Sequence, residues 1–187
     1  MRGDGTAAGI ARRLRAAPPR AGATRVVAID GRSGAGKSTL AARVAVALDG
    51  APVVALEGLY GGWDGLDDGI ARLAAEVLAP LAAAHRALVP CYDWTAGAWA
   101  APWPLDPPPL LIVEGVGAAA LPAARYESLT VWLDAPAAVR KRRALARDGD
   151  VFAPHWDRWA AQEDALLARD PIPGRAGLAI DAGEPIG

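Results

Sequence analysis

Short apolar runs alternate with helical patterns along the chain. Apolar runs rich in β-branched or long aliphatic residues predict buried strands at 26–30, 52–56, 110–113, 130–133 and 178–181. Helical patterns lie between them, at 38–48, 70–85, 135–147 and 155–169. Strands that alternate with helices predict an α/β fold of three layers, α/β/α, around a mostly parallel sheet.

The remaining segments predict no long helix or strand. Residues 1–23 contain a short helical pattern at 10–14 and a proline-containing lead-in, and 24–187 have a length typical of one domain. Residues 58–68 are too rich in glycine for a helix. Residues 88–109 hold three tryptophans among many prolines, so we expect an ordered but irregular segment there.

Residues 31–38 read GRSGAGKS and match G-x-x-x-x-G-K-[ST], the P-loop motif, between a predicted strand and a predicted helix. Glycines let backbone N–H groups approach a polyphosphate, Lys37 reaches the β- and γ-phosphates, and Ser38 binds Mg²⁺. A chance glycine-rich turn is disfavoured, because the chain places one of its only two lysines here, beside eighteen arginines. We expect ATP and Mg²⁺ as cofactors, with nucleotide contacts from Gly31, Arg32, Ser33, Gly34, Ala35, Gly36, Lys37, Ser38 and Thr39.

Charge and composition argue against several kinds of binding partner and of site. A net charge of −1 at pH 7 provides no basic field for nucleic acid or an anionic membrane. No apolar run can span a bilayer, and residues 1–23 lack the apolar core of a secretory signal, so we expect a cytoplasmic protein. The single cysteine excludes an internal disulfide and a cysteine-based zinc cluster. We expect a small-molecule partner and leave a homodimer open.

Two glutamates end predicted strands. Glu57 follows the second strand and Glu114 the third, and the carboxyl ends of parallel strands meet at one edge of a sheet, beside the P-loop. We predict Glu57 as the general base or a Mg²⁺ ligand, and Glu114 as a Mg²⁺ or acceptor contact. Solvated carboxylates at strand ends are the alternative.

Three arginines recur at helical spacing near the end of the chain. Arg140, Arg143 and Arg147 stand at i, i+3 and i+7 and so share one helix face. Guanidinium groups there would neutralise charge on a transferring phosphoryl group. We predict Arg143 as a catalytic residue, Arg143 and Arg147 as ATP contacts and Arg140 as an acceptor contact, against the alternative of a solvated basic face.

The segment 57–104 is the candidate acceptor region. Its aromatic residues Tyr60, Trp63, Tyr92, Trp94 and Trp99 could stack on a planar ring or simply form core. Asp64 and Asp93 could accept hydrogen bonds from sugar hydroxyls or cap turns.

Five stretches together resemble the uridine kinase–phosphoribulokinase group of P-loop kinases. They are the P-loop, Glu57-Gly58-Leu59-Tyr60, Pro90-Cys91-Tyr92-Asp93-Trp94, Val113-Glu114-Gly115, and the arginine series 140, 143 and 147 followed by Asp148. The resemblance implies a P-loop NTPase fold with a five-stranded parallel sheet and a mobile helical lid at about 140–156. It also implies ATP on the P-loop, an acceptor pocket behind Tyr60 and Tyr92, and the first acid after strand two as base. Glu57 stands where the group has Asp, and Gly97 stands near its pyrimidine-reading His.

The leading hypothesis is an ATP- and Mg²⁺-dependent kinase that phosphorylates a hydroxyl of a nucleoside or similar polyhydroxylated acceptor. A nucleoside monophosphate kinase of cytidylate type and a catalytically impaired regulatory module are the alternatives. Between 56 and 104 only Arg72 and Arg86 could bind an acceptor phosphate, whereas six carboxylates could bind hydroxyls: Glu57, Asp64, Asp67, Asp68, Glu76 and Asp93. The sequence therefore favours an acceptor without phosphate.

Overall fold

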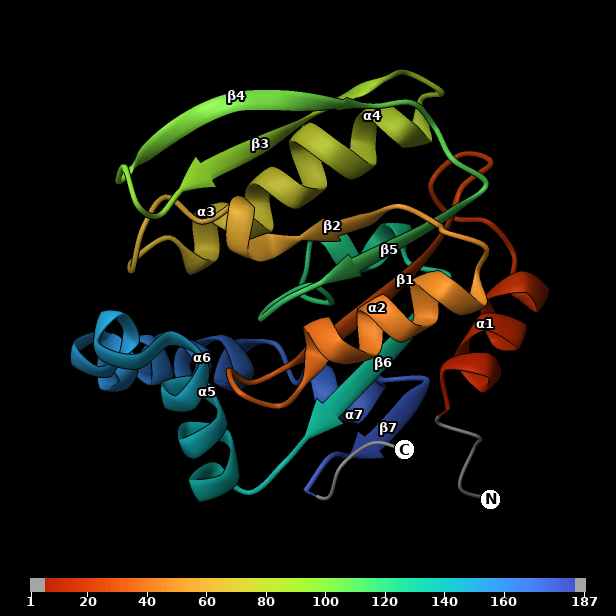
Figure 1. Ribbon diagram of the computed structural model, residues 1–187. Helices are drawn as coiled ribbons and strands as arrows, with labels where there is room; N and C mark the ends of the chain where they lie inside the picture. Colours follow the sequence, from red (N-terminus) through yellow and green to blue (C-terminus); the bar gives the residue numbers. More distant parts are fainter. Residues whose placement is uncertain (1–5, 184–187) are drawn as a thin grey trace.

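A five-stranded parallel sheet forms the centre of the computed structural model, which describes residues 6–183 (Figure 1). Its order is β2 (Val53–Ala55), β5 (Leu110–Glu114), β1 (Arg25–Gly31), β6 (Leu129–Asp134) and β7 (Leu178–Asp181). Every neighbouring pair is parallel. The predicted α/β fold with five parallel strands is confirmed.

Successive residues of β1 face opposite sides of the sheet and join two separate cores. Val27 and Ile29 pack with Leu14 of α1 (Ala7–Ala16) and Leu40 of α2 (Lys37–Ala47). The helical pattern predicted at 10–14 thus belongs to α1, whose apolar side is part of this core. Thr6 begins α1 by accepting a hydrogen bond from the Gly9 N–H at 3.1 Å.

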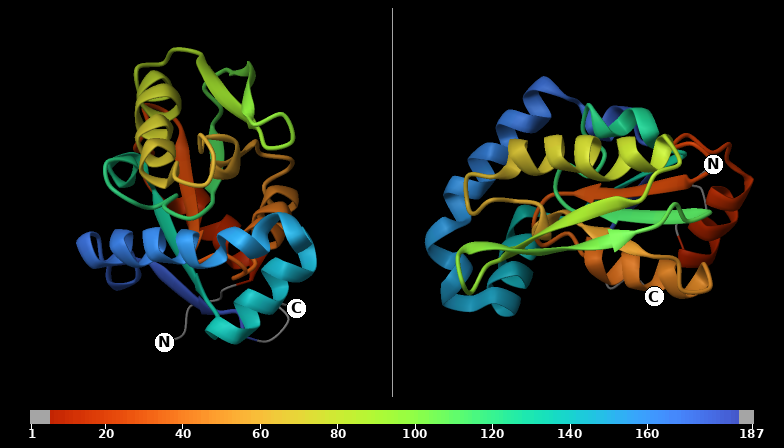
Figure 2. Two further views of the ribbon diagram at one scale, coloured as in Figure 1. Left: turned by 90° about the vertical axis from the view of Figure 1, so that its left-hand side faces the viewer. Right: turned by 90° about the horizontal axis from the view of Figure 1, so that it is seen from above.

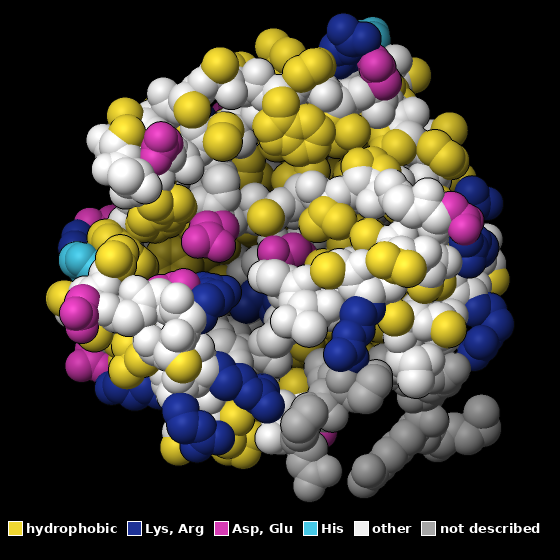
Figure 3. All heavy atoms as spheres, viewed as in Figure 1, with side chains coloured by type: hydrophobic (Ala, Val, Ile, Leu, Met, Phe, Trp, Pro, Cys, Tyr) yellow, Lys and Arg dark blue, Asp and Glu magenta, His cyan; other side chains and the backbone are white. Residues whose placement is uncertain are grey.

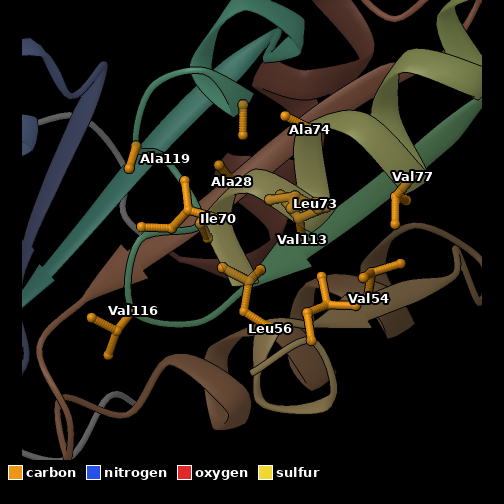
Figure 4. Close-up of a cluster of buried hydrophobic side chains, with 14 of the residues drawn as sticks. Ala28, Val54, Leu56, Ile70, Leu73, Ala74, Val77, Val113, Val116 and Ala119 are labelled. Carbon is orange, nitrogen blue, oxygen red and sulfur yellow. The ribbon is translucent and has the colours of Figure 1, made fainter. Parts of the chain in front are cut away.

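The second core lies under a long helical segment on the opposite face. This segment runs through α3 (Leu66–Arg72), the π-helical η2 (Leu73–Leu78) and α4 (Ala79–Ala82). Figure 4 shows side chains of Ile70 and Leu73 beside Val113 of β5. The helix begins at 66 rather than 70, and its first turn holds Asp67 and Asp68, whose charges suit a helix N-terminus.

Residues predicted as irregular form an antiparallel hairpin of β3 (Ala87–Asp93) and β4 (Ala98–Leu105), so that prediction is wrong. Pro102 and Pro104 lie in β4, which pairs only with β3 and has a second, free edge where missing N–H groups are tolerated. The hairpin lies alongside the α3–α4 segment (Figures 1 and 2). It extends the wall above the carboxyl edge of the sheet.

Two helices follow β6 and are called the lid helices below: α5 (Ala137–Phe152), which covers most of the predicted lid region 140–156, and α6 (Trp156–Arg169), which begins where that region ends. Within α5, Gly149 has φ 53° and ψ −133°, a conformation that only glycine adopts readily, so the predicted break near 148–150 is present as a kink. Short helical turns complete the chain: η1 (Leu56–Gly58), η3 (Ala123–Tyr126), η4 (Ala153–His155) and α7 (Ile172–Arg175). Within residues 6–183, no helix combines the length and apolar composition needed to cross a bilayer.

Candidate active site

A cavity of about 290 Å³ opens where the P-loop, the ends of β2 and β5, and the lid helices meet. Figure 3 shows a hollow on this side of the molecule with hydrophobic side chains in its wall and acidic and basic side chains beside it. One end is polar, with Lys37, Ser38, Glu57, Glu114 and Arg147. The other end is aromatic. The predicted acids and the P-loop are therefore brought together at the carboxyl edge of the sheet.

The P-loop turns tightly into α2. Gly36 precedes the helix at φ 102°, and no side chain caps the first amides of α2, so these N–H groups suit an anion. Gly34 has φ 79°, and a Cβ there would overlap the carbonyl oxygen of Arg140 at the start of the lid. Of the nine nucleotide contacts predicted within residues 31–39, Ser33, Gly34, Lys37 and Ser38 line the cavity. The others, Gly31, Arg32, Ala35, Gly36 and Thr39, belong to the same loop and helix start but not to the cavity wall.

Lys37 is held in place for a negatively charged ligand. Its side chain is buried, and Nζ donates to the carbonyl oxygen of Arg32 at 3.2 Å. Burial lowers the pKa of Lys37, whereas the charges of Glu114, Glu163 and Asp30 act in the opposite direction. A triphosphate at the start of α2 would add negative charge beside this ammonium and favour its protonated form.

Ser38 and Glu114 form the group that could hold a magnesium ion. Ser38 Oγ donates to Glu114 Oε1 at 3.0 Å, and burial raises the pKa of Glu114 although Lys37 and Ser38 act to lower it. Within the described part of the chain, no cluster of three or more His, Cys, Asp or Glu side chains could enclose a metal by itself. A few protein oxygens completed by phosphate and water fit the way proteins bind Mg²⁺. The residues present therefore fit this ion together with a nucleotide.

The three predicted lid arginines have different surroundings. Arg147 lines the cavity and makes a bidentate pair with Asp148, at 2.7 and 2.6 Å. Arg143 Nη1 instead donates to the Ala182 carbonyl oxygen at 2.7 Å. Arg140 is buried and donates to the carbonyl oxygens of Ala135, at 3.0 Å, and Ser33, at 3.3 Å. The structure brings Arg147 to the cavity, and neither Arg143 nor Arg140.

Three of the five predicted acceptor-site aromatics line the cavity: Tyr60, Trp63 and Trp94. Trp63 is central to this group, with ring centroids 4.8 Å from Trp94 and 5.2 Å from Phe152 of the lid. Tyr92 and Trp99 lie outside the cavity wall, and the Tyr92 ring packs edge-on against Trp94 and Trp99.

The two predicted hydroxyl-binding aspartates are not at the cavity. Asp64 is exposed and pairs with Arg158 of α6. Asp93 Oδ1 accepts hydrogen bonds from the N–H groups of Thr95 and Ala96, at 2.8 and 3.0 Å. Asp93 therefore caps the hairpin turn, which was the alternative given for it above.

Sequence reasoning missed two buried acids that hold the P-loop. Asp30 is the last residue but one of β1, and its carboxylate accepts hydrogen bonds from the N–H groups of Gly31, Gly117 and Ala119, at 2.6, 3.0 and 2.9 Å. Burial nevertheless raises its pKa to about 6. The sequence could have indicated this role, because Asp30 is a charged residue at the end of an apolar run directly before the P-loop.

Glu163 of α6 is the second missed residue. Its Oε1 accepts from the Ser33 N–H and its Oε2 from Arg32 Nε, both at 2.8 Å. It is 1% exposed. Its position four residues after Trp159 and three before Leu166 places a carboxylate on the apolar side of the helix, and this spacing could have marked it.

No protein-family model matches the chain, and neither does any curated protein sequence. Among solved structures, a candidate uridine kinase from Bacillus stearothermophilus superposes with a TM-score of 0.64 at 20% identity, over 84% of this chain and 89% of that one. A candidate fructose transport system kinase from a Silicibacter species superposes with a TM-score of 0.58 at 22% identity, over 94% and 98%. At such identities the likeness concerns the fold. The chain has the α/β fold of the uridine-kinase-like P-loop kinases.

Proposed function

We propose that the protein transfers the γ-phosphoryl group of ATP to a hydroxyl of an uncharged small molecule, with Mg²⁺. The observation that carries this proposal is the gathering of Lys37, Ser38, Glu57, Glu114 and Arg147 around one cavity at the N-terminus of α2. Phosphoryl transfer depends on positioning and charge stabilisation, and these residues supply both.

Each residue has a role that follows from its place. The free amides at the start of α2 and the Lys37 ammonium hold the phosphates. Ser38 and Glu114 would hold the magnesium ion, which neutralises charge on the phosphate oxygens. Arg147 reaches the cavity from the lid and would contact the same phosphates once they compete with Asp148 for its guanidinium.

Glu57 is the proposed general base. It lies in η1, directly after β2, and is an exposed residue in the cavity wall. The acceptor hydroxyl must lose its proton as it attacks, and a carboxylate within hydrogen-bond reach can accept it. Glu57 therefore orients the hydroxyl and receives its proton.

The monophosphate kinase alternative is disfavoured by what the acceptor-region arginines contact. Arg72 pairs with Glu76 at 2.8 Å and lies over the Trp99 ring, and Arg86 pairs with Asp106 at 2.7 Å. Neither lines the cavity. A dianionic acceptor would therefore lack paired guanidinium contacts at its own end.

Acceptor-dependent release of ADP tests the proposal. The panel contains matched pairs (uridine and UMP, cytidine and CMP, deoxycytidine and dCMP), a sugar alcohol and an apolar alcohol, each with and without Mg²⁺. We expect turnover only with Mg²⁺ and only with acceptors that carry no phosphate. A clear preference for a monophosphate would establish the alternative, and tight ATP binding without turnover of any acceptor would favour the regulatory module.

A further inference from the structure

The aromatic end of the cavity points to the chemistry of the acceptor. We propose that the acceptor is a small alcohol in which a short chain connects the reacting hydroxyl to an apolar ring. This ring, rather than a chain of hydroxyls, occupies the aromatic end of the cavity. The proposal rests on the proposed function, because it assigns the second substrate of that same cavity.

Five rings form this end of the cavity: Tyr60, Trp63, Trp94, Phe152 and Trp159. They come from the loop after η1, from the hairpin, and from both lid helices. Trp63 and Phe152 are stacked at 13°, Trp63 and Trp94 are tilted at 59°, and Tyr60 and Trp159 meet edge-on at 5.0 Å. Aromatic surfaces in these orientations suit contact with another ring.

Most polar atoms of these rings are already engaged or enclosed. Tyr60 Oη donates to the Val116 carbonyl oxygen at 2.7 Å, and Trp94 Nε1 donates to the Glu57 carbonyl oxygen at 3.0 Å. Trp159 Nε1 is buried and has no hydrogen-bond partner among the described residues. Of the four polar ring atoms, only the indole N–H of Trp63 is both unburied and without a hydrogen-bond partner among residues 6–183, so it is left for a ligand. A nucleobase or a polyol would bury several donors and acceptors here without partners, which is unfavourable.

The carboxylates that would bind a polyol contact other groups. Asp64 pairs with Arg158, Asp67 pairs with Arg169, and Asp93 caps the hairpin turn. Glu57 is the one carboxylate of the 57–104 segment in the cavity wall, and the two other acids there, Glu114 and Asp148, bond to Ser38 and Arg147. Glu57 can serve one reacting hydroxyl, so the rest of the acceptor has to be recognised by apolar contact.

The volume limits the acceptor to a small molecule. The cavity of about 290 Å³ includes the space next to Lys37 and Ser38 where the phosphoryl group is transferred. What remains suits a single ring on a short chain.

Calorimetry tests this assignment of the aromatic end independently of turnover. It measures the binding of four neutral or cationic probes in the presence of Mg²⁺ and AMP-PNP. The probes are 2-phenylethanol, uridine, sorbitol and choline. We expect 2-phenylethanol to bind at least tenfold more tightly than each of the other three. Tighter binding of uridine or sorbitol would overturn the proposal that the aromatic end binds an apolar ring. Tighter binding of choline would show that the aromatic wall recognises a cation.

Substitutions test whether the probe binds to the aromatic end of the cavity rather than elsewhere on the protein. Trp63→Ala and, as a second variant, Trp94→Leu should each weaken 2-phenylethanol binding at least tenfold while AMP-PNP still binds. Trp99→Ala is the matched control, because Trp99 lies on the same hairpin outside the cavity wall, and it should leave both affinities unchanged. Unchanged probe binding in Trp63→Ala and Trp94→Leu would contradict the proposal. If the probe binds as expected but no acceptor supports ADP release, the proposed function fails while the assignment of the wall stands.

Discussion

Glu57 is the residue whose chemistry can be tested most simply. Replacing its carboxylate with an amide in Glu57→Gln keeps the size but removes the proton acceptor. We expect kcat to fall about 10²-fold or more with little change in the KM for ATP, because the interaction is needed only in the transition state. Steady-state kinetics at saturating acceptor measures both values.

The conservative variant provides the control for Glu57. Glu57→Asp retains a carboxylate one methylene shorter and should keep part of the activity. If Glu57→Gln instead turns over at the parental rate, the base is another acid of the cavity wall, and Glu114 is the candidate.

Glu127 predicts how stability changes with pH. It is buried, Thr130 Oγ1 donates to its Oε2 at 2.6 Å, and its Oε1 has no hydrogen-bond partner among the described residues. Burial raises its pKa from 4.5 to about 8. The folded protein therefore holds a proton that the unfolded chain releases between these values, so stability falls as pH rises from about 4.5 to 8.

Glu127→Gln should remove this dependence, because the amide stays neutral. We expect the free energy of unfolding of the variant, relative to the parent, to increase by roughly 2–4 kcal/mol between pH 5 and pH 9, at about 1.4 kcal/mol for each pKa unit. Urea unfolding at both values measures it. Asp30 is unchanged in both proteins, so its own titration cancels. A constant difference between the two proteins would show that Glu127 titrates normally.

At the scale of elements, α6 is attached to the P-loop by one buried carboxylate. Glu163 holds the Ser33 N–H and the Arg32 guanidinium at once, and Gln can satisfy only one of these two donors through its oxygen. We expect Glu163→Gln to lower the free energy of unfolding by about 1–3 kcal/mol, the usual cost of losing a hydrogen bond to a charged group. Urea unfolding at pH 7 measures it.

The neighbouring residue is a matched control for Glu163. Asp164 also pairs with Arg32, at 2.7 Å, but its side chain is 67% exposed. Asp164→Asn should therefore cost less than about 1 kcal/mol. Equal effects of the two substitutions would mean that the buried contact has no special role in joining α6 to the P-loop.

The elements that could be predicted from the sequence are those fixed by local patterns. The strand, glycine loop and helix around Lys37 are contiguous, so their order already determined the P-loop. The hairpin was missed because prolines normally argue against strands. Pro102 and Pro104 are tolerated since β4 pairs on one side only, and pairing is a property of the fold rather than of the segment.

Contacts between distant residues explain why the acceptor site was predicted less well. Asp64 and Asp67 are exposed carboxylates whose partners, Arg158 and Arg169, lie 94 and 102 residues away. Helical spacing predicted one helix face for Arg140, Arg143 and Arg147, and all three lie in α5, but the spacing could not show that Arg140 is bound to the Ser33 carbonyl oxygen. Trp63 meets Phe152 only because the lid folds over the cavity.

At the scale of the whole molecule, the cavity lies where the order of the strands in the sheet reverses direction. From β1 the chain passes to β2 on one side, and from β5 it returns past β1 to β6 on the other. In open α/β sheets this crossover leaves space above the carboxyl ends of the central strands. The P-loop, Glu114 and the lid reach that space from separate parts of the chain, so phosphoryl transfer is a property of the complete fold.

Phosphoryl transfer at the P-loop is tested most directly by replacing each of the two lysines with alanine in a separate variant. Lys37→Ala should lower acceptor-dependent transfer from γ-labelled ATP by about 10³-fold or more, because the ammonium next to the transferred group is lost. Lys141 is the only other lysine of the chain, and its exposed ammonium lies 3.9 Å from Asp157, so Lys141→Ala should retain the parental rate. Circular dichroism checks that both variants are folded. Parental transfer by folded Lys37→Ala would contradict the proposed kinase activity.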